Sequence, residues 1–130
     1  MGFDARETSP EFASAVAEGL TANGAHVLNL GLCGTEEVYF ATVHNAASAG
    51  VMVTASHNPI DYNGFKIVRA GSRPLAEGTF RNLEGATAKA LKGMARRSRG
   101  KQTQIYVRDA YVEKVCSFVD PIKLQSQSLV

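Results

Sequence analysis

The chain has 130 residues, of which 45% are hydrophobic, and a formal net charge of +2. This length predicts one domain with a core of its own, and so small a charge argues against nucleic acid or a membrane surface as a partner. No apolar run is long enough to span a membrane and no signal-peptide pattern opens the chain, so we expect a cytoplasmic protein with free thiols at Cys33 and Cys116.

The first predicted helix starts in residues 8–11 (TSPE), where Ser9 can cap the helix and a proline suits its first turn. Asn23 and Gly24 should end it. Phe12, Val16 and Leu20 recur four apart, with Ala13 and Ala17 alongside, and together they predict one apolar face.

The rest of the chain alternates between short apolar runs and helical patterns. We expect strands at residues 25–30, 50–53 and 65–69, helices at 35–47, 77–95 and 108–118, a turn at 71–74 and an extended piece at 104–107. This alternation predicts an α/β fold with a mostly parallel, mixed sheet flanked by helices, whose functional loops lie at the carboxyl ends of strands. The strand that should lead into residues 2–4 is mostly absent, so the domain is predicted to be incomplete.

Residues 54–66 (TASHNPIDYNGFK) bring a hydroxyl, an imidazole, an amide, a carboxylate and an amine together directly after an apolar strand. Ser56 is a candidate nucleophile if a base or a charge activates it. Lys66 can pair with phosphate or transfer a proton, and His57 can donate a hydrogen bond. The alternative for Ser56 is a hydroxyl that stabilises a turn; Asn58 and Asn63 are expected to organise the loop.

Four segments in the same order resemble the α-D-phosphohexomutases, the phosphomannomutase and phosphoglucomutase superfamily. They are residues 54–59, which resemble the phosphoserine loop, together with residues 2–6 (GFDAR), 61–66 (DYNGFK) and 108–112 (RDAYV). Residues 34–42 (GTEEVYFAT) resemble bacterial phosphomannomutases of polysaccharide synthesis. The resemblance implies a first domain over residues 1–120, truncated at its first strand, followed at 121–130 by the start of a linker and a divergent tail.

The resemblance further implies exchange of phosphate between mannose 6-phosphate and mannose 1-phosphate, through a phosphoserine and a hexose 1,6-bisphosphate. Ser56 would carry the phosphoryl group and bind Mg²⁺ through it, and Lys66 and His57 would be catalytic. Phosphate or substrate would contact His57, Asn58, Lys66 and Arg6. For Arg6 the alternative is a pair with Asp4 that only holds the loop together.

Other functions stay open at this point. The family's metal-binding, sugar-recognition and phosphate loops are missing from the sequence, so the chain alone is expected to lack turnover. It could instead be a non-catalytic fragment that self-associates through apolar surface, or have phosphoglucomutase specificity. A serine hydrolase is a weaker rival, because the neighbouring side chains of Ser56 and His57 should point apart on an extended segment.

Overall fold

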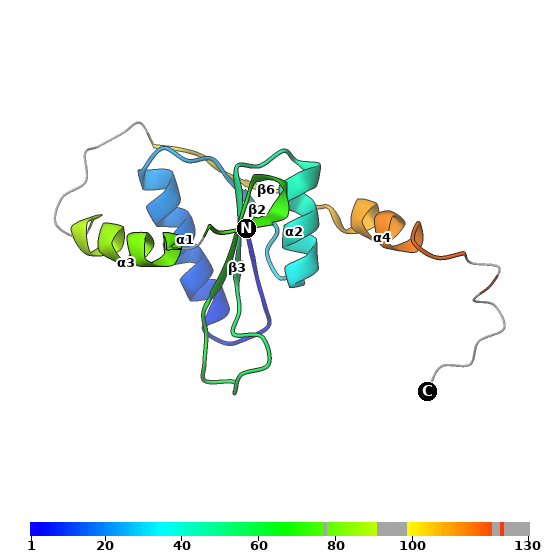
Figure 1. Ribbon diagram of the computed structural model, residues 1–130, viewed down its shortest axis with the longest axis horizontal. Coiled ribbons are helices and arrows are strands. Elements are labelled where there is room, and N and C mark those ends of the chain that lie inside the picture. Colours follow the sequence, from blue (N-terminus) through cyan, green and yellow to red (C-terminus); the bar gives the residue numbers. More distant parts are fainter. Residues whose placement is uncertain (77, 91–98, 121–122, 124–130) are drawn as a thin grey trace.

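Strands from distant parts of the sequence meet at the centre of the fold, with α1 (Ser9–Ala22) and α2 (Thr35–His44) on either side in Figure 1. The computed structural model describes residues 1–76, 78–90, 99–120 and 123. Four strands form one sheet, in the order β1 (Gly2–Phe3), β3 (Ala49–Val53), β4 (Phe65–Arg69) and β5 (Arg73–Pro74). A second sheet pairs β2 (Val27–Asn29) with β6 (Gln102–Gln104).

Backbone hydrogen bonds along β1 join these two sheets into one layer. The amino group of Met1 donates to the carbonyl of Leu28 at 2.6 Å, and Leu30 N–H donates to the carbonyl of Met1 at 2.8 Å. Phe3 N–H then donates to the carbonyl of Gly31 at 3.1 Å. The strand order across the layer is therefore β6-β2-β1-β3-β4-β5, with β1 in the middle.

The sheet is mixed, which confirms the predicted fold class, although its antiparallel share is larger than expected. β1 pairs with β3 and β2 pairs with β6 in parallel, whereas the β3–β4 and β4–β5 pairings are antiparallel. The core lies under β3, where Met52 and Val53 are 1% and 0% exposed. The carboxyl end of β3 is thus held rigidly at the place where the serine loop begins.

Helix α1 packs through small residues rather than through the predicted large ones. Phe12 and Leu20 are 38% and 37% exposed, and the buried positions are Ser9, Ala13, Ala17 and Thr21. These four recur four apart, so the predicted burial of Ala13 and Ala17 is confirmed, whereas Phe12 and Leu20 lie at the edge of the buried face. Small side chains let the helix approach the sheet closely. Thr8 occupies the cap position, and Ser9, predicted as the cap, is instead the first helical residue and fully buried.

Helix α2 begins one residue after Gly34, whose N–H donates to the Glu37 carboxylate at 2.9 Å. It ends at His44 rather than near residue 47, because Ala46 has a left-handed φ of 48°. Helix α4 (Arg108–Cys116) contacts α2 through the Phe40–Tyr111 ring pair and an ion pair between Arg108 and Glu37 at 3.1 Å. These contacts hold α4 at one side of the domain (Figure 1).

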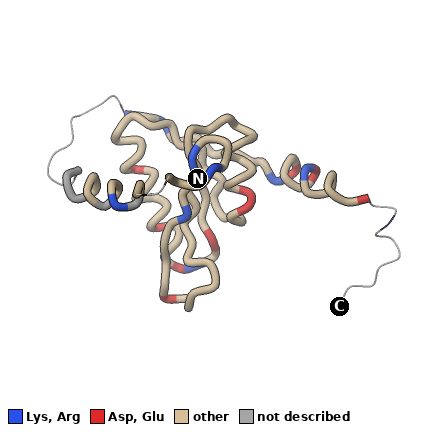
Figure 2. Tube along the Cα trace, in the orientation of Figure 1, with Lys and Arg blue, Asp and Glu red and all other residues tan. Residues whose placement is uncertain are grey.

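The remaining elements differ in detail from the prediction. The turn at 71–74 contains a 3₁₀ helix, η1 (Ala70–Ser72), and the short strand β5, while the predicted extended piece is β6, two residues earlier. Helix α3 spans Thr79–Ala90; the predicted residues 77 and 91–95 lie outside the described part of the chain, as does most of the tail at 121–130. Residues of both charge signs lie along the described trace (Figure 2).

Candidate active site

The serine loop leaves β3 at Thr54 and returns to β4 at Gly64, and the backbone closes it at its base. Thr54 N–H donates to the carbonyl of Gly64 at 2.9 Å. Ser56 has a φ of 56°, a left-handed conformation that costs a residue with a Cβ roughly 1–3 kcal/mol. Its N–H donates to Thr54 Oγ1 at 2.9 Å. The Ser56 side chain is exposed at this turn.

Arg6 holds the backbone of this loop in place through hydrogen bonds. Its side chain is 8% exposed, and its two terminal nitrogens donate to four loop carbonyls. Those carbonyls belong to Ser56, Asn58, Pro59 and Tyr62. The Nε atom lies 3.3 Å from Asp4 Oδ2. A guanidinium has five N–H donors, so every donor of Arg6 has a protein partner here.

Asp4 forms the next layer of support. Its Oδ1 accepts from Arg6 N–H and from the Ser9 hydroxyl, and Asn63 Nδ2 also donates to Ser9 Oγ at 2.9 Å. Burial raises the pKa of Asp4, but hydrogen bonds from Ser9, Thr54 and Arg6 N–H and the Arg6 charge outweigh it, so the pKa lies below its ordinary value. The carboxylate is therefore the stable form beside the guanidinium.

The two asparagines act on the loop as the sequence predicted. Asn58 Nδ2 donates to the carbonyl of Ala55 at 3.0 Å, and the Asn63 side chain both accepts from Gly64 N–H and donates to Thr8 and Ser9. Asn63 therefore ties the end of the loop to the start of α1.

Ser56 and His57 do not point apart, so that part of the argument against a hydrolase was wrong. Ser56 Oγ lies 3.5 Å from His57 Nδ1, and both side chains are exposed. The segment is not extended at Ser56, because its φ is positive, and the alternation of side chains expected on a strand does not apply. The imidazole can exchange a proton with the serine oxygen at this separation after a small movement.

Lys66 lies on β4 opposite Met52, whereas β4's Phe65 contacts Phe12 of α1 on the other face of the sheet. Alternation along the strand therefore puts Lys66 on the α2 side. Within the described residues the side chain of Lys66 makes no hydrogen bond or ion pair, while its backbone pairs with β3. The structure thus places Ser56, His57 and Asn58 in one loop that Arg6 contacts from the segment after β1, and leaves Lys66 on the adjoining strand.

Two residues support the loop more than the sequence predicted: Thr54 was given no role, and Asp4 was considered only as a partner of Arg6. The signals were present in the sequence. Thr54 stands two residues before Ser56, the spacing at which a threonine hydroxyl accepts from the backbone in a turn. Asp4 stands two residues before Arg6 and accepts from its N–H at 3.1 Å.

The described residues do not fit a complete magnesium site. They contain no group of three His, Cys, Asp or Glu residues arranged to hold a metal ion. Near the serine hydroxyl, the nearest loop carboxylate in sequence is the exposed Asp61. Mg²⁺ needs several oxygen ligands in near-octahedral geometry, so the described side chains do not complete its coordination by themselves.

The fold and the loop together define a domain of the phosphohexomutase class. Residues 1–93 match the family model of phosphoglucomutase/phosphomannomutase, α/β/α domain I. The chain therefore belongs to the phosphoglucomutase/phosphomannomutase family.

Curated relatives and a solved structure agree with this assignment. A phosphomannomutase of Escherichia coli K12 is 42% identical over 132 residues, and the phosphohexose mutases of Xanthomonas campestris are 43% identical over 130. The chain is covered completely in both comparisons, but spans 29% of each relative's length. A phosphoglucomutase/phosphomannomutase family protein from Burkholderia thailandensis superposes with a TM-score of 0.75 at 29% identity, covering 92% of this chain and 27% of that one. Within the described residues, no helix is long and apolar enough to cross a membrane.

Proposed function

We propose that this chain is the serine-bearing part of an enzyme that interconverts mannose 6-phosphate and mannose 1-phosphate. The observation that carries the proposal is the loop itself: Arg6 binds four of its carbonyls, and Ser56 stands exposed at its strained turn. Phosphoryl transfer depends on position and electrostatics more than on covalent chemistry by the protein. A loop whose backbone is held by Arg6, and which exposes the hydroxyl of Ser56, supplies position.

In the proposed reaction Ser56 carries a phosphoryl group at rest. A sugar hydroxyl oxygen forms a new bond to phosphorus while the bond from phosphorus to Ser56 Oγ breaks. A base takes the proton of the sugar hydroxyl, and the serine oxygen becomes protonated. The resulting hexose 1,6-bisphosphate returns its other phosphoryl group to Ser56 by the reverse step, so the enzyme is regenerated and atoms balance.

His57 and Lys66 are the proposed proton-transfer and phosphate-binding groups. His57 is favoured for exchange with Ser56 because its Nδ1 lies 3.5 Å from Oγ. From the neighbouring strand, Lys66 can pair with a phosphate or exchange a proton with a sugar hydroxyl. Arg6 can bind phosphate only by losing a hydrogen bond to a loop carbonyl, so we assign it to holding the loop. Asn58 is the remaining loop residue that we propose to contact phosphate or substrate.

The isolated chain is proposed to lack turnover. It spans 29% of its curated relatives, and its described residues contain no acidic cluster for Mg²⁺. In the whole enzyme, carboxylates from other segments would complete a magnesium site with the phosphate on Ser56. Cytoplasmic sugar metabolism is the proposed setting.

A hybrid enzyme tests the proposal. Residues 1–120 replace the matching segment of the E. coli phosphomannomutase, and conversion of mannose 1-phosphate and glucose 1-phosphate is followed in parallel with Mg²⁺. We expect turnover by the hybrid, with mannose preferred, and none by the isolated chain. A correctly folded hybrid without activity on either sugar contradicts the proposal. Activity on glucose 1-phosphate alone would instead support phosphoglucomutase specificity.

The second candidate, a serine hydrolase, is favoured by the Ser56–His57 contact alone. Labelling of Ser56 by a fluorophosphonate, abolished in His57→Ala, would support it. We expect no such labelling, because no acid in the described residues bonds to the imidazole of His57.

A further inference from the structure

Both backbone polar groups of Ser56 are held by side chains. Its N–H donates to Thr54 Oγ1 at 2.9 Å, and its carbonyl accepts from Arg6 Nη2 at 2.9 Å. The N–H belongs to the peptide unit before the Ser56 Cα, and the carbonyl belongs to the unit after it. Because a change in φ or ψ of Ser56 turns one unit against the other, such a change would lengthen one of these two bonds.

The two bonds stabilise a conformation that Ser56 would otherwise leave. Its φ of 56° is left-handed, and a residue with a Cβ persists there only where its surroundings determine the backbone. The strain of such a residue is of the same order as the net contribution of one or two hydrogen bonds. Loss of either bond should therefore let Ser56 relax toward a negative φ.

Thr54 is anchored through both its backbone and its side chain. It is 7% exposed, and its N–H donates to the carbonyl of Gly64 at the base of the loop. A hydroxyl has one proton to donate and lone pairs with which to accept. Since the Ser56 N–H is the donor in their contact, the proton of the Thr54 hydroxyl is available for another acceptor, and the Thr54 side chain also hydrogen-bonds to the Asp4 carboxylate. Asp4 thus contacts both side chains that hold Ser56, since it also pairs with Arg6.

We propose that the hydroxyl of Thr54 positions Ser56 for phosphoryl transfer, by keeping its backbone left-handed and thereby setting the direction of Oγ. This inference rests on the proposed function, in which Ser56 carries the phosphoryl group. The attacking and leaving oxygens lie roughly in line in such a transfer, and a misplacement of about 1 Å can cost about a hundredfold in rate. Thr54 acts only through the backbone of Ser56 and takes no part in the bond changes.

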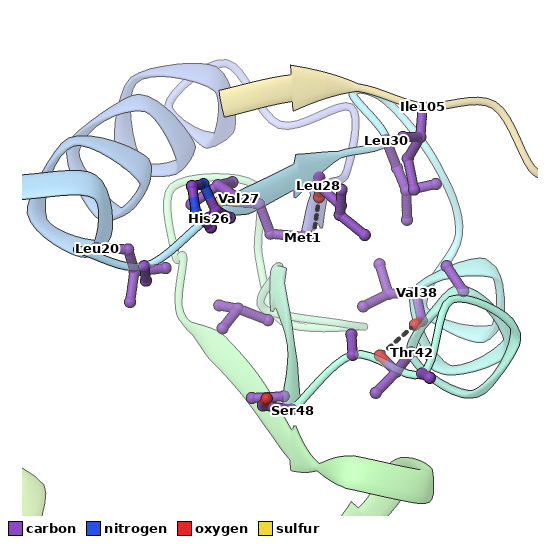
Figure 3. A pocket seen from close by; sticks show the side chains of 16 residues that line it. Met1, Leu20, His26, Val27, Leu28, Leu30, Val38, Thr42, Ser48 and Ile105 are labelled. Carbon is purple, nitrogen blue, oxygen red and sulfur yellow. Dashed lines mark hydrogen bonds between the residues drawn. The ribbon is translucent and has the colours of Figure 1, made fainter. Parts of the chain in front are cut away.

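Three variants separate this role from a general effect on stability. Thr54→Val removes the hydroxyl and keeps a β-branched side chain, whereas Thr54→Ser keeps the hydroxyl. The control is Thr42→Val. Thr42 is 3% exposed, and its Oγ1 donates to the carbonyl of Val38 at 2.7 Å within α2 (Figure 3). It lies beside Gly50, at the opposite end of β3 from the serine loop, so this variant loses a buried hydroxyl at a distance from Ser56.

NMR of the full chain measures the conformation of Ser56 without any need for activity. The one-bond Cα–Hα coupling of a residue differs between positive and negative φ, and exchange of its amide proton reports its hydrogen bond. In Thr54→Val we expect Ser56 to lose the coupling of a positive φ, and its N–H to exchange about tenfold faster. Thr54→Ser and Thr42→Val should keep the coupling of the parent chain.

Kinetics of the hybrid enzyme carrying residues 1–120 connect this conformation with turnover. Thr54→Val should lower kcat for mannose 1-phosphate by about a hundredfold and leave KM little changed, because the substrate is still bound but the nucleophile is misdirected. Thr54→Ser should restore most of kcat, and Thr42→Val should keep the kcat of the parent. If Thr54→Val is unfolded, Thr54→Ala replaces it, since alanine removes the hydroxyl without placing a new methyl group beside Asp4.

Each arm of the experiment can overturn the proposal. A positive φ that persists at Ser56 in Thr54→Val shows that the hydroxyl does not hold it. An unchanged kcat, or a rise in KM alone, shows that the conformation does not position the nucleophile. Equal losses of kcat in Thr54→Val and Thr42→Val assign the effect to stability. An inactive parent hybrid contradicts the proposed function instead, and the NMR measurements then still decide whether Thr54 holds Ser56.

Discussion

Arg6 Nη2 donates to the carbonyl of Ser56 at 2.9 Å, across fifty positions of sequence. The candidate nucleophile is therefore positioned by its backbone, and its hydroxyl is left free of this contact. Because the same guanidinium also binds the carbonyls of Asn58, Pro59 and Tyr62, the shape of the loop and the stability of the domain should depend on one side chain.

Replacing Arg6 with alanine should lower the free energy of unfolding by about 3 kcal/mol, because four partly buried carbonyls and the Asp4 carboxylate lose a charged partner. Arg6→Lys should recover less than half of this loss, since an ammonium cannot reach several carbonyls in forked geometry. Urea unfolding followed by circular dichroism measures both changes. Arg81→Ala, at an exposed position of α3, is the control; equal losses in the two alanine variants would contradict the assigned role.

Stability should fall in acid through Asp4. Its folded-state pKa is depressed, so its contribution is complete above the ordinary value of 3.8 and is lost as pH falls through the lower folded value. Asp4→Asn should cost about 1–2 kcal/mol near neutral pH and should weaken the loss of stability between neutral pH and acid. Urea titrations at several pH values test this. If Asp4→Asn and the exposed Asp61→Asn gave the same pH profile as the parent, the support network would be misassigned.

The two cysteines should differ in reactivity. Burial, with a smaller effect of the nearby Glu37 charge, raises the pKa of the Cys33 thiol to about 11, whereas Cys116 is exposed on α4. The thiolate is the reactive form, so iodoacetamide near neutral pH should modify Cys116 first. Peptide mass spectrometry over time gives the two rates. Faster modification of Cys33 in the folded chain would be inconsistent with its half-buried position.

Two glycines should respond in opposite directions to alanine. A Cβ at Gly50 would lie 2.2 Å from Thr42 Oγ1, so Gly50→Ala should destabilise the domain by about 1–3 kcal/mol. At Gly19, within α1, a Cβ would meet nothing within 4 Å, so Gly19→Ala should stabilise by about 0.5–1 kcal/mol. Thermal unfolding of both variants tests the packing of α2 on β3. A neutral Gly50→Ala would show that this contact is looser than described.

The order of helices and strands could be predicted because it depends on local patterns. The apolar run before Thr54, the alternation in β4 and the residues that start α2 each specify one element. Contacts made across the sequence were harder to predict. Ser9 is buried because it bonds to Asp4 and Asn63, which are distant from it or outside its helix. From the sequence, a serine at this position predicted only a helix cap. β6 is built of polar residues, and only its pairing with β2 makes it a strand.

In the candidate site, too, local features could be predicted and contacts across the sequence could not. Ser56, His57 and Asn58 could be located from a contiguous motif, and the structure keeps them in one loop. The role of Arg6 could not be decided, because its four loop carbonyls are set by the fold and leave no pattern in the sequence. The Ser56–His57 contact was missed because it requires a positive φ at a residue other than glycine.

The most direct test of the central claim is phosphopeptide mass spectrometry of the hybrid enzyme carrying residues 1–120, after turnover with mannose 1-phosphate and Mg²⁺. We predict one phosphate on Ser56, lost together with activity in Ser56→Ala and retained in Ser14→Ala, which changes an exposed serine of α1. Sustained turnover by Ser56→Ala, or an active hybrid whose phosphate lies on another residue, would contradict the account.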